Sequence, residues 1–330
     1  MTKDEVLSIL NKKADYVSGE QISKELGISR AAINQAVKIL RDDGYDIESK
    51  TRLGYKLISS PDCITYGELA RFIDPERMKT VTTLDSVDST NNRLKVMGQD
   101  GAPSGSVVIA DHQESGKGRR GRSFVSPKGS GIYLSYLLRP DCSAEEISSL
   151  TAYVAVAVAK SIENSCGLTP QIKWVNDILI DGRKLVGILT ELSVESESGA
   201  ITGCVIGIGI NVNLDLADFP EDLQDKATSL SIVKGEPVKR ALIISELISR
   251  LDKLKEDFPS AKGEYLEYYR SHCPILGKKI NVFKIIGKDP VTATALEITD
   301  NFSLKVRYED GKEEDLRSGE VTIRGENGYI

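Results

Sequence analysis

The chain has 330 residues, of which 40% are hydrophobic and 28% charged, proportions typical of a globular protein with two or three domains. It has no apolar run near the roughly 20 residues that span a bilayer, no signal-peptide pattern and no CxxC motif, so we expect a cytoplasmic protein without disulfides. The formal charge of −6 argues against bulk attraction to nucleic acid, and the 2 histidines argue against a histidine metal site or a Ser-His-Asp triad.

Residues 1–61 have the spacing of a winged helix-turn-helix domain. A first amphipathic helix is followed by a second, whose start carries the capping-box pair Ser18 and Gln21. Gly27 can adopt the left-handed conformation that ends this helix, and Ser29 can cap a third. The rest of the segment resembles the two strands of a wing. This layout predicts DNA binding, with a three-helix packing unit that does not contact DNA as the alternative.

The third helix would bury one apolar stripe and expose polar side chains on the other face. Arginine can read guanine, Asn and Gln can read adenine, and lysine can meet phosphate. The candidate DNA contacts are Ser29, Arg30, Ala31, Asn34, Gln35 and Lys38. Because basic and acidic residues nearly balance over residues 1–61, one copy would release few counterions, so useful operator affinity is expected to need a dimer.

Residues 62–273 mix strand and helix patterns and predict a central α/β domain. A basic glycine-rich loop, residues 116–122, separates predicted strands at Val107–Ala110 and 132–138. Glycines among cations permit close approach of the backbone to a ligand, so we expect this loop to grip an anion. A solvated flexible loop is the alternative. The loop is not a Walker A motif, because Gly118 stands where Ser or Thr is required.

An Asp-Gly pair at residues 181–182, between two apolar runs, predicts a tight β-hairpin. Lys184 then lies just inside the returning strand. Gly187 would weaken that strand unless another group approaches closely there. Asn176 and Asp177 precede the turn, where they can orient a nucleotide or Mg²⁺. A surface lysine at the end of a strand is the alternative interpretation of Lys184.

Ser89, Thr90 and Asn91 precede an amphipathic helix pattern. Such residues at a helix start are usually caps. Their hydroxyl groups, with the N–H groups of the helix start, can instead bind an uncharged polar group such as a ureido ring. The spacing leaves both interpretations open.

After residue 274 the sequence shows short strand patterns only, separated by turns at 287–290, 300–301 and 310–311. This pattern predicts a small β-barrel or meander at residues 274–330.

Five motifs occur in an order that resembles the bifunctional biotin protein ligases, which also repress the biotin operon. They are DSTNN, GKGRRGR, KWVND, RKLVGILTE and GIGINVN. The resemblance covers essentially the whole chain. It implies an α+β multidomain fold: an N-terminal winged helix-turn-helix, a central mixed α/β catalytic domain with an antiparallel-rich sheet, and a C-terminal SH3-like β-barrel.

The resemblance also implies the reaction and its partners. Biotin and ATP would form biotinyl-5′-AMP with Mg²⁺, and biotin would then pass to a lysine of the biotin carboxyl carrier protein of acetyl-CoA carboxylase. The adenylate-loaded protein would act as a ligand-promoted homodimer on biotin operator DNA. The first step needs no general base, because the biotin carboxylate is already a nucleophile, which agrees with the scarcity of histidine.

The site residues that the resemblance implies fall into three groups. The catalytic residues would be Lys184, Arg119 and Asp177. Biotin would contact Ser89, Thr90, Asn91, Gln113, Lys117, Gly118, Arg119 and Lys184. ATP and the adenylate would contact Gly116, Arg119, Arg120, Arg122, Lys173, Asn176, Asp177 and Asn211, with no protein site for a resident metal.

Two positions depart from the family pattern. Lys117 replaces the first arginine of the family's GRGRRGR loop, which keeps the charge but loses the planar bidentate fork. Val175 replaces the proline of KWPND, which removes a fixed backbone angle and no functional group. The alternatives are a non-catalytic ligand-sensing regulator, a lipoate ligase of the same superfamily and a ligase without repression.

Overall fold

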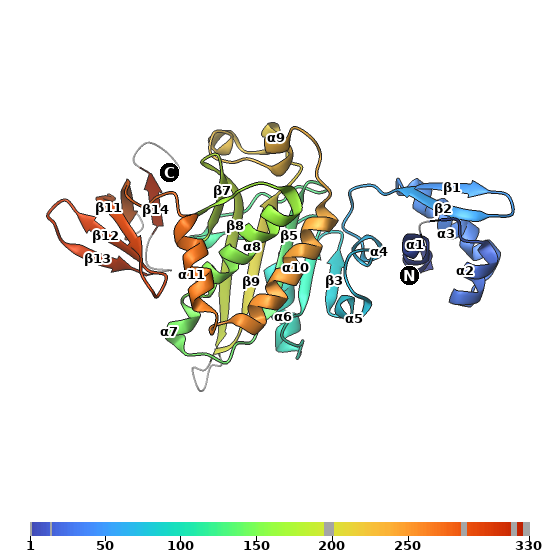
Figure 1. Ribbon diagram of the computed structural model, residues 1–330, viewed down its shortest axis with the longest axis horizontal. Coiled ribbons are helices and arrows are strands. Elements are labelled where there is room, and N and C mark those ends of the chain that lie inside the picture. The colour runs from blue at the N-terminus through green and yellow to red at the C-terminus, as the bar shows by residue number, and fades with distance from the viewer. Residues whose placement is uncertain (1, 14, 195–200, 285–288, 318–321, 326–330) are drawn as a thin grey trace.

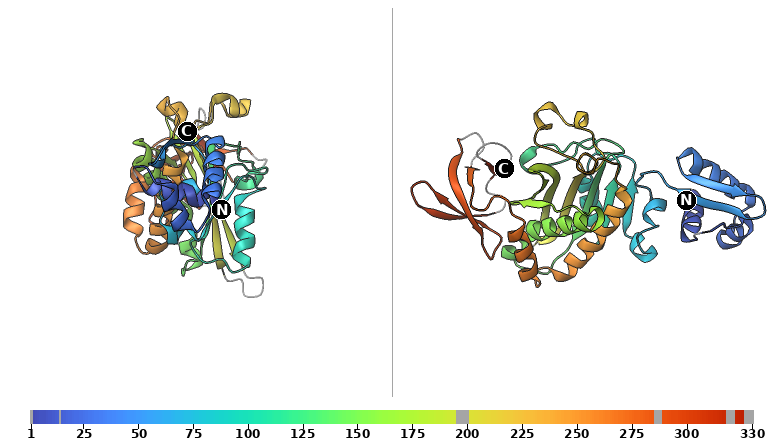
Figure 2. Two further views of the ribbon diagram at one scale, coloured as in Figure 1. Left: turned by 90° about the vertical axis from the view of Figure 1, so that its right-hand side faces the viewer. Right: turned by 45° about the horizontal axis from the view of Figure 1, so that its top comes forward.

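The computed structural model describes residues 2–13, 15–194, 201–284, 289–317 and 322–325. Three units follow one another along the molecule, with the helical N-terminal unit and the C-terminal sheet at opposite ends of a central sheet domain (Figure 1). The right-hand view of Figure 2 shows the same arrangement, and the left-hand view looks along the molecule from the end that carries the N-terminal unit. This is the α+β multidomain fold that the sequence predicts. The division at residues 61 and 273 stays a prediction.

The N-terminal unit is a helix-turn-helix followed by a two-stranded wing. Ser18 forms the predicted capping box with Gln21, and Gly27 ends the second helix with a φ of 67°. The side-chain oxygen of Ser29 accepts a hydrogen bond from the backbone N–H of Ala32 in the third helix. Its elements are α1 Thr2–Lys12, α2 Gly19–Leu26, α3 Arg30–Asp42, β1 Asp46–Lys50 and β2 Gly54–Ser59. The helices bury a common core that includes Val6, Leu7, Ile22, Ile33, Val37 and Leu40.

The central domain is built on a seven-stranded sheet with the order β3-β4-β5-β9-β8-β7-β6. Only β3 and β4 are parallel among the described pairs of this sheet, so it is mixed and rich in antiparallel pairs, as predicted. The strands are β3 Val81–Leu84, β4 Val107–Ala110, β5 Gly131–Leu138, β6 Gln171–Lys173, β7 Asp177–Ile180, β8 Arg183–Val194 and β9 Ile201–Asn211.

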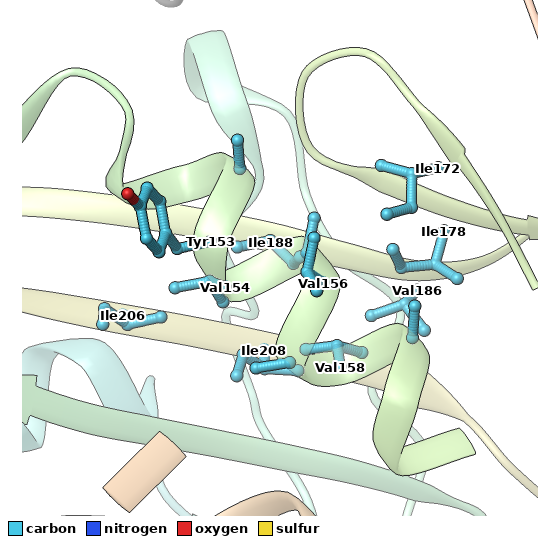
Figure 3. Close-up of a cluster of buried hydrophobic side chains, with 14 of the residues drawn as sticks. Tyr153, Val154, Val156, Val158, Ile172, Ile178, Val186, Ile188, Ile206 and Ile208 are labelled. Atoms are coloured by element: carbon cyan, nitrogen blue, oxygen red, sulfur yellow. The ribbon is translucent and has the colours of Figure 1, made fainter. Parts of the chain in front are cut away.

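Helices cover both faces of this sheet. The long helices α8, Leu150–Cys166, and α10, Arg240–Asp257, pack together on one face with α11, Lys262–Ser271, while α6, Thr90–Gln99, lies on the other. Figure 3 shows valines 154, 156 and 158 of α8 beside Ile188 of β8 and Ile206 and Ile208 of β9, and all six side chains are buried. The shorter helices are α4 Tyr66–Leu69, α5 Pro75–Met78, α7 Ala144–Ile147 and α9 Leu230–Lys234, with 3-10 turns at Arg119–Gly121, Leu216–Asp218 and Glu221–Leu223.

A buried arginine joins the segment after the wing to the central domain. Arg240, at the start of α10, is 1% exposed, and its guanidinium lies 2.7 Å from both Asp62 Oδ2 and Asp111 Oδ1. Asp62 Oδ1 also accepts a hydrogen bond from the backbone N–H of Arg240 at 2.9 Å. Asp62 therefore caps α10 from outside the helix and fixes the path of the chain between the two units.

The C-terminal unit is an antiparallel sheet with the order β13-β12-β11-β10-β14. Its strands are β10 Lys279–Phe283, β11 Val291–Ile298, β12 Leu304–Tyr308, β13 Glu313–Leu316 and β14 Thr322–Gly325. The sequence does not predict β13, because Glu313, Glu314 and Asp315 are acidic and only Leu316 is buried. Part of the predicted turn at 287–290 lies outside the described residues.

The described helices include none that is long and apolar enough to cross a membrane. The five cysteines, all within the described ranges, are free, with Cys63 and Cys142 half-buried and the other three buried.

Candidate functional site

A cavity opens on the face of the central sheet where β8 and β9 run side by side. It has about 1010 Å³ of empty space, its open mouth included. The predicted site residues that line it are Ser89, Thr90, Asn91, Gln113, Lys117, Gly118, Arg119, Arg120, Arg122, Lys173, Asn176, Asp177 and Lys184. Thus one cavity collects residues from four separate motifs.

Glycines of the two central strands form the floor of the cavity. Gly187 of β8 pairs with Gly209 of β9, and the alternating isoleucines of these strands face the core. A Cβ on Gly209 would lie 2.5 Å from the ring of Phe124, and one on Gly207 would lie 2.4 Å from Asn91 Oδ1. The absence of side chains at these glycines therefore lets Phe124 and Asn91 lie directly on the backbone of the sheet.

Hydrogen bonds fix the polar end of the cavity. Gln113 Oε1 accepts from the backbone N–H of Thr90 at 2.9 Å and from its hydroxyl at 3.1 Å, and Gln113 Nε2 donates to Ser126 Oγ at 3.0 Å. Ser89 occupies the N-cap position of α6, but its side chain makes no capping hydrogen bond. Ser89, Thr90 and Asn91 are each 2–3% exposed, so they form a preorganised cluster of small polar groups.

The basic loop lies over one side of the cavity. Arg119 donates to Asn176 Oδ1 at 2.9 Å, and Lys117 donates to Asn92 Oδ1 at 2.6 Å. Burial, together with the charges of Arg120 and Arg122, lowers the pKa of Arg119, against the opposing effect of Asp177. An arginine remains charged despite such a shift, so Arg119 brings a partly desolvated cation to the cavity.

Lys184 and Asp177 form an ion pair inside the cavity. Lys184 Nζ lies 2.7 Å from Asp177 Oδ1, and the two side chains are 29% and 15% exposed. The predicted hairpin holds them, with Asp181 at φ 49° and Gly182 at φ 74° in its turn. The Asn176 amide donates to the carbonyl of Ile188 at 2.9 Å, which ties the KWVND segment to β8.

Two predicted nucleotide contacts lie outside the lining of the cavity. Gly116, the first residue of the basic loop, is buried, and a Cβ there would come within 2.3 Å of the Phe124 carbonyl oxygen. Asn211 is 5% exposed and donates to the carbonyl of Thr228 at 3.1 Å. Both residues shape neighbouring segments instead of facing the cavity.

Several lining residues were not predicted as site residues. Phe124 follows the basic loop, Gly187, Gly207 and Gly209 form the floor, and Ile323 comes from β14 of the C-terminal unit. Trp174 is a buried residue, 3% exposed, and its indole N–H donates to the Phe302 carbonyl at 2.9 Å. It nevertheless also lines the cavity. The Gly-Ile alternation in β9 is the signal that could have identified the floor.

The predicted DNA contacts gather on α3. Five of them, Arg30, Ala31, Asn34, Gln35 and Lys38, are exposed along this helix. Arg30 lies 3.2 Å from Glu20, and Asn34 accepts a hydrogen bond from the hydroxyl of Tyr55 in the wing. Ser29 instead uses its side-chain oxygen to cap the helix at Ala32 N.

Comparison with known proteins matches two parts of the chain to protein families. Residues 83–211 match the Biotin/lipoate A/B protein ligase family, and residues 2–56 match an HTH domain. The bifunctional ligase/repressor BirA of Bacillus subtilis (strain 168) is 39% identical over 245 residues, which cover 74% of this chain and 75% of the relative. The protein of the same name from Escherichia coli (strain K12) is 30% identical over 321 residues, or 96% of each chain.

Solved structures agree with the fold of the catalytic part. A biotin protein ligase from Aquifex aeolicus, in complex with biotin and ATP, matches with a TM-score of 0.63 and 28% identity, covering 74% of this chain and 98% of that one. The helix-turn-helix joined to this ligase fold defines an enzyme that is also a transcriptional regulator. The chain belongs to the family of bifunctional biotin protein ligases and repressors.

Proposed function

We propose that this protein joins biotin to ATP to give biotinyl-5′-AMP, and then transfers biotin to a lysine of the biotin carboxyl carrier protein of acetyl-CoA carboxylase. We further propose that the adenylate-loaded protein dimerises on biotin operator DNA and represses the biotin operon, which places its action in the cytoplasm. Relatives that are named ligase/repressors, and a related ligase that binds biotin and ATP, support this proposal.

The observation that carries the proposal is the convergence of two kinds of site in one cavity. At one end, Thr90 and Gln113 offer donors and acceptors that suit the ureido ring of biotin. At the other end, Lys184 and Arg119 place two cations where the carboxylate of biotin would meet the α-phosphate. A long ligand with a polar uncharged head and a carboxylate tail fits this arrangement.

The first step follows from these charges. An oxygen of the biotin carboxylate attacks the α-phosphorus of ATP, the bond from that phosphorus to the bridging oxygen breaks, and pyrophosphate leaves. Lys184 and Arg119 stabilise the negative charge that gathers on the phosphoryl oxygens. No side chain has to remove a proton, because the nucleophile is already ionised.

Asp177 fits Mg²⁺ as a single carboxylate ligand, since this ion usually takes one or two carboxylates together with the substrate phosphates and water. When bound, it would neutralise charge on the departing pyrophosphate. Trp174 and Ile323 also line the cavity, and their apolar side chains would help to exclude water from a bound nucleotide.

In the second step, the amine of the carrier lysine attacks the acyl carbon, the bond from that carbon to the AMP oxygen breaks, and an amide forms. A lysine ammonium has an ordinary pKa of about 10.4, so the amine must first lose a proton. Asp177 lies in the cavity and is the carboxylate that we propose assists this loss.

The repressor function would use α3 and the wing, with the exposed residues Arg30, Asn34, Gln35 and Lys38 facing DNA. For the dimer we propose the outer part of β8. Among the described strands, β7 pairs with β8 only as far as Gly187, whereas β9 continues to pair with β8 as far as Val194. The side of β8 away from β9 therefore offers backbone groups that a second copy can pair with.

ATP–pyrophosphate exchange that depends on biotin tests the proposed reaction, and the mass of a carrier-domain substrate tests the transfer. Lipoate ligase is the second candidate, because the matching family includes both activities. Competition between biotin and lipoic acid in the exchange assay separates the two. Deletion of residues 1–60 should remove operator binding while exchange persists, and DNA binding by the shortened protein would refute the role of α3.

A further inference from the structure

A chain of hydrogen bonds runs from β8 to the start of α6, partly buried at Glu191 and fully buried at Ser135. Glu191 of β8 accepts from Asn91 Nδ2 at 2.6 Å and from Lys95 Nζ at 2.5 Å. On its other side, Asn91 Oδ1 accepts from the hydroxyl of Ser135 at 2.5 Å. The Ser135 oxygen also lies 2.8 Å from Thr90 Oγ1, so the chain ends on a residue that lines the cavity.

The direction of every hydrogen bond in this chain follows from Glu191. An ionised carboxylate can only accept, so the amide nitrogen of Asn91 must face Glu191 and its oxygen must face Ser135. Burial of Glu191 favours its neutral form, but the hydrogen bonds from Lys95 and Asn91 outweigh this effect and lower its pKa, which keeps it ionised. The single hydroxyl hydrogen of Ser135 is then committed to Asn91.

This order determines what Thr90 can offer to a ligand. Because Ser135 has given its hydrogen to Asn91, the hydroxyl of Thr90 is left to donate to Ser135 Oγ or to Gln113 Oε1. In both arrangements the lone pairs of Thr90 Oγ1 stay available to the cavity. They suit a ligand N–H group, which a ureido ring has and a dithiolane ring lacks.

There is little room for this chain to rearrange. Asn91 is 3% exposed and Ser135 is 0% exposed, and Asn91 rests directly against the backbone of Gly207. Reversal of the amide would place its N–H₂ group against the hydroxyl of Ser135 and its oxygen against the carboxylate of Glu191. Two acceptors would then face each other in a buried site, which is costly.

We propose that Glu191 is a specificity-determining positioning residue: through Asn91 and Ser135 it keeps Thr90 Oγ1 an acceptor for the ureido N–H of biotin. Glu191 does not itself line the described cavity, so it acts through these residues and does not touch substrate. The proposal rests on the proposed function, because it assumes that this end of the cavity binds biotin.

The test uses the full-length protein with the substitution Glu191→Gln. The glutamine side chain has the same shape, but its amide can donate a hydrogen bond as well as accept one. Biotin-dependent ATP–pyrophosphate exchange should show a KM for biotin raised about tenfold or more, with the KM for ATP and kcat within about twofold. The preference for biotin over lipoic acid should fall by a similar factor. Lys160→Met is the matched control, because it removes a similar lysine–glutamate pair that does not line the cavity, and its KM for biotin should stay within about twofold.

An unchanged KM for biotin and an unchanged preference in Glu191→Gln would overturn the proposal. An equal rise in the KM for biotin and the KM for ATP would also overturn it, because that pattern indicates a general structural role. If Glu191→Gln does not fold, Ser135→Ala decides the question, because it breaks the same chain and should produce the same selective loss for biotin. Failure of the proposed function is distinguishable, because the unmodified protein would then show no exchange that depends on biotin.

Discussion

The ammonium of Lys184 lies 2.7 Å from the carboxylate of Asp177, inside the cavity and across the hairpin that carries both residues. Each charge is therefore held in place before any ligand arrives. A lysine anchored in this way loses less rotational freedom when an anionic group binds, and it adds its charge where the phosphoryl oxygens would lie.

Replacement of Lys184 by alanine should reduce adenylate formation about a hundredfold or more, because one preorganised charge donor contributes about 3 kcal/mol to the transition state. ATP–pyrophosphate exchange with biotin measures this effect, with the thermal midpoint as the check on folding. Lys226→Ala is the matched control, since Lys226 is a nearby, partly exposed lysine that does not line the cavity. Exchange by Lys184→Ala near the unmodified rate would contradict the assignment.

The glycine floor leads to a second prediction. A Cβ on Gly209 would lie 2.5 Å from the Phe124 ring, so Gly209→Ala should push that ring into the cavity and raise the KM for biotin about tenfold or more. Gly263→Ala in α11 provides the comparison, because a Cβ there meets no atom within 4 Å. That change should leave kinetics unaltered and add about 0.5–1 kcal/mol to the stability of the helix. Equal kinetics for the two variants would mean that the floor is not part of the site.

Arg240 provides a test of stability that is separate from catalysis. It is 1% exposed and pairs with two carboxylates, so Arg240→Ala should leave two partly buried carboxylates without their partner and open a cavity, and it should lower the free energy of unfolding by about 3 kcal/mol. Arg250→Ala removes a more exposed pair from the same helix and should cost at most about 1 kcal/mol. Urea unfolding measures both, and similar losses in the two variants would refute the special role of Arg240.

The pH dependence of stability should depend in part on Glu191. Although its burial opposes ionisation, hydrogen bonds from Lys95 and Asn91 lower its pKa in the folded state below the ordinary 4.5. The folded state thus binds this proton more weakly than the unfolded state, so the stabilisation is complete above that value and is lost as pH falls through the folded pKa. The stability difference between the unmodified protein and Glu191→Gln should be larger at pH 7 than at pH 3, and a difference that grows toward acid would contradict this.

On the DNA-binding unit, Gln35→Ala and Lys38→Ala should behave differently. Loss of a base contact by Gln35→Ala should weaken binding about tenfold or more at one base position of the operator. Loss of a phosphate contact by Lys38→Ala should weaken binding to all DNA sequences. It should also reduce the slope of log binding constant against log salt concentration by about 1. Operator shift assays at several salt concentrations measure both effects, and ligase exchange should be unchanged. Identical profiles for the two variants would refute this division of roles.

The sequence predicts the parts of this protein that depend on local chemistry. The capping box at Ser18, the left-handed turn at Gly27 and the hairpin around Gly182 each follow from a few neighbouring residues, and the structure has all three. Most predicted cavity residues also meet, because their motifs sit at strand ends and turns of one sheet.

The features that the sequence does not predict depend on contacts between distant parts of the chain, which no local pattern encodes. Ile323 reaches the cavity from a separate sheet, and Arg240 meets Asp62 across a separation of 178 residues. Asn211 lies within a predicted motif, but its side chain is committed to the Thr228 carbonyl. Acidic β13 becomes a strand because its backbone pairs with β12, a tertiary effect that its composition does not reveal.

The cap that Asp62 places on α10 has a consequence for shortened genes that lose the DNA-binding unit and keep the ligase. A shortened gene that still encoded Asp62 would keep the buried guanidinium of Arg240 neutralised and would leave the ligase unit folded. A shortened gene that began just after this residue would leave α10 without its cap and Arg240 with only Asp111 as a counterion. We therefore expect the ligase unit to be more stable when the shortened gene still encodes Asp62 than when it begins just after this residue.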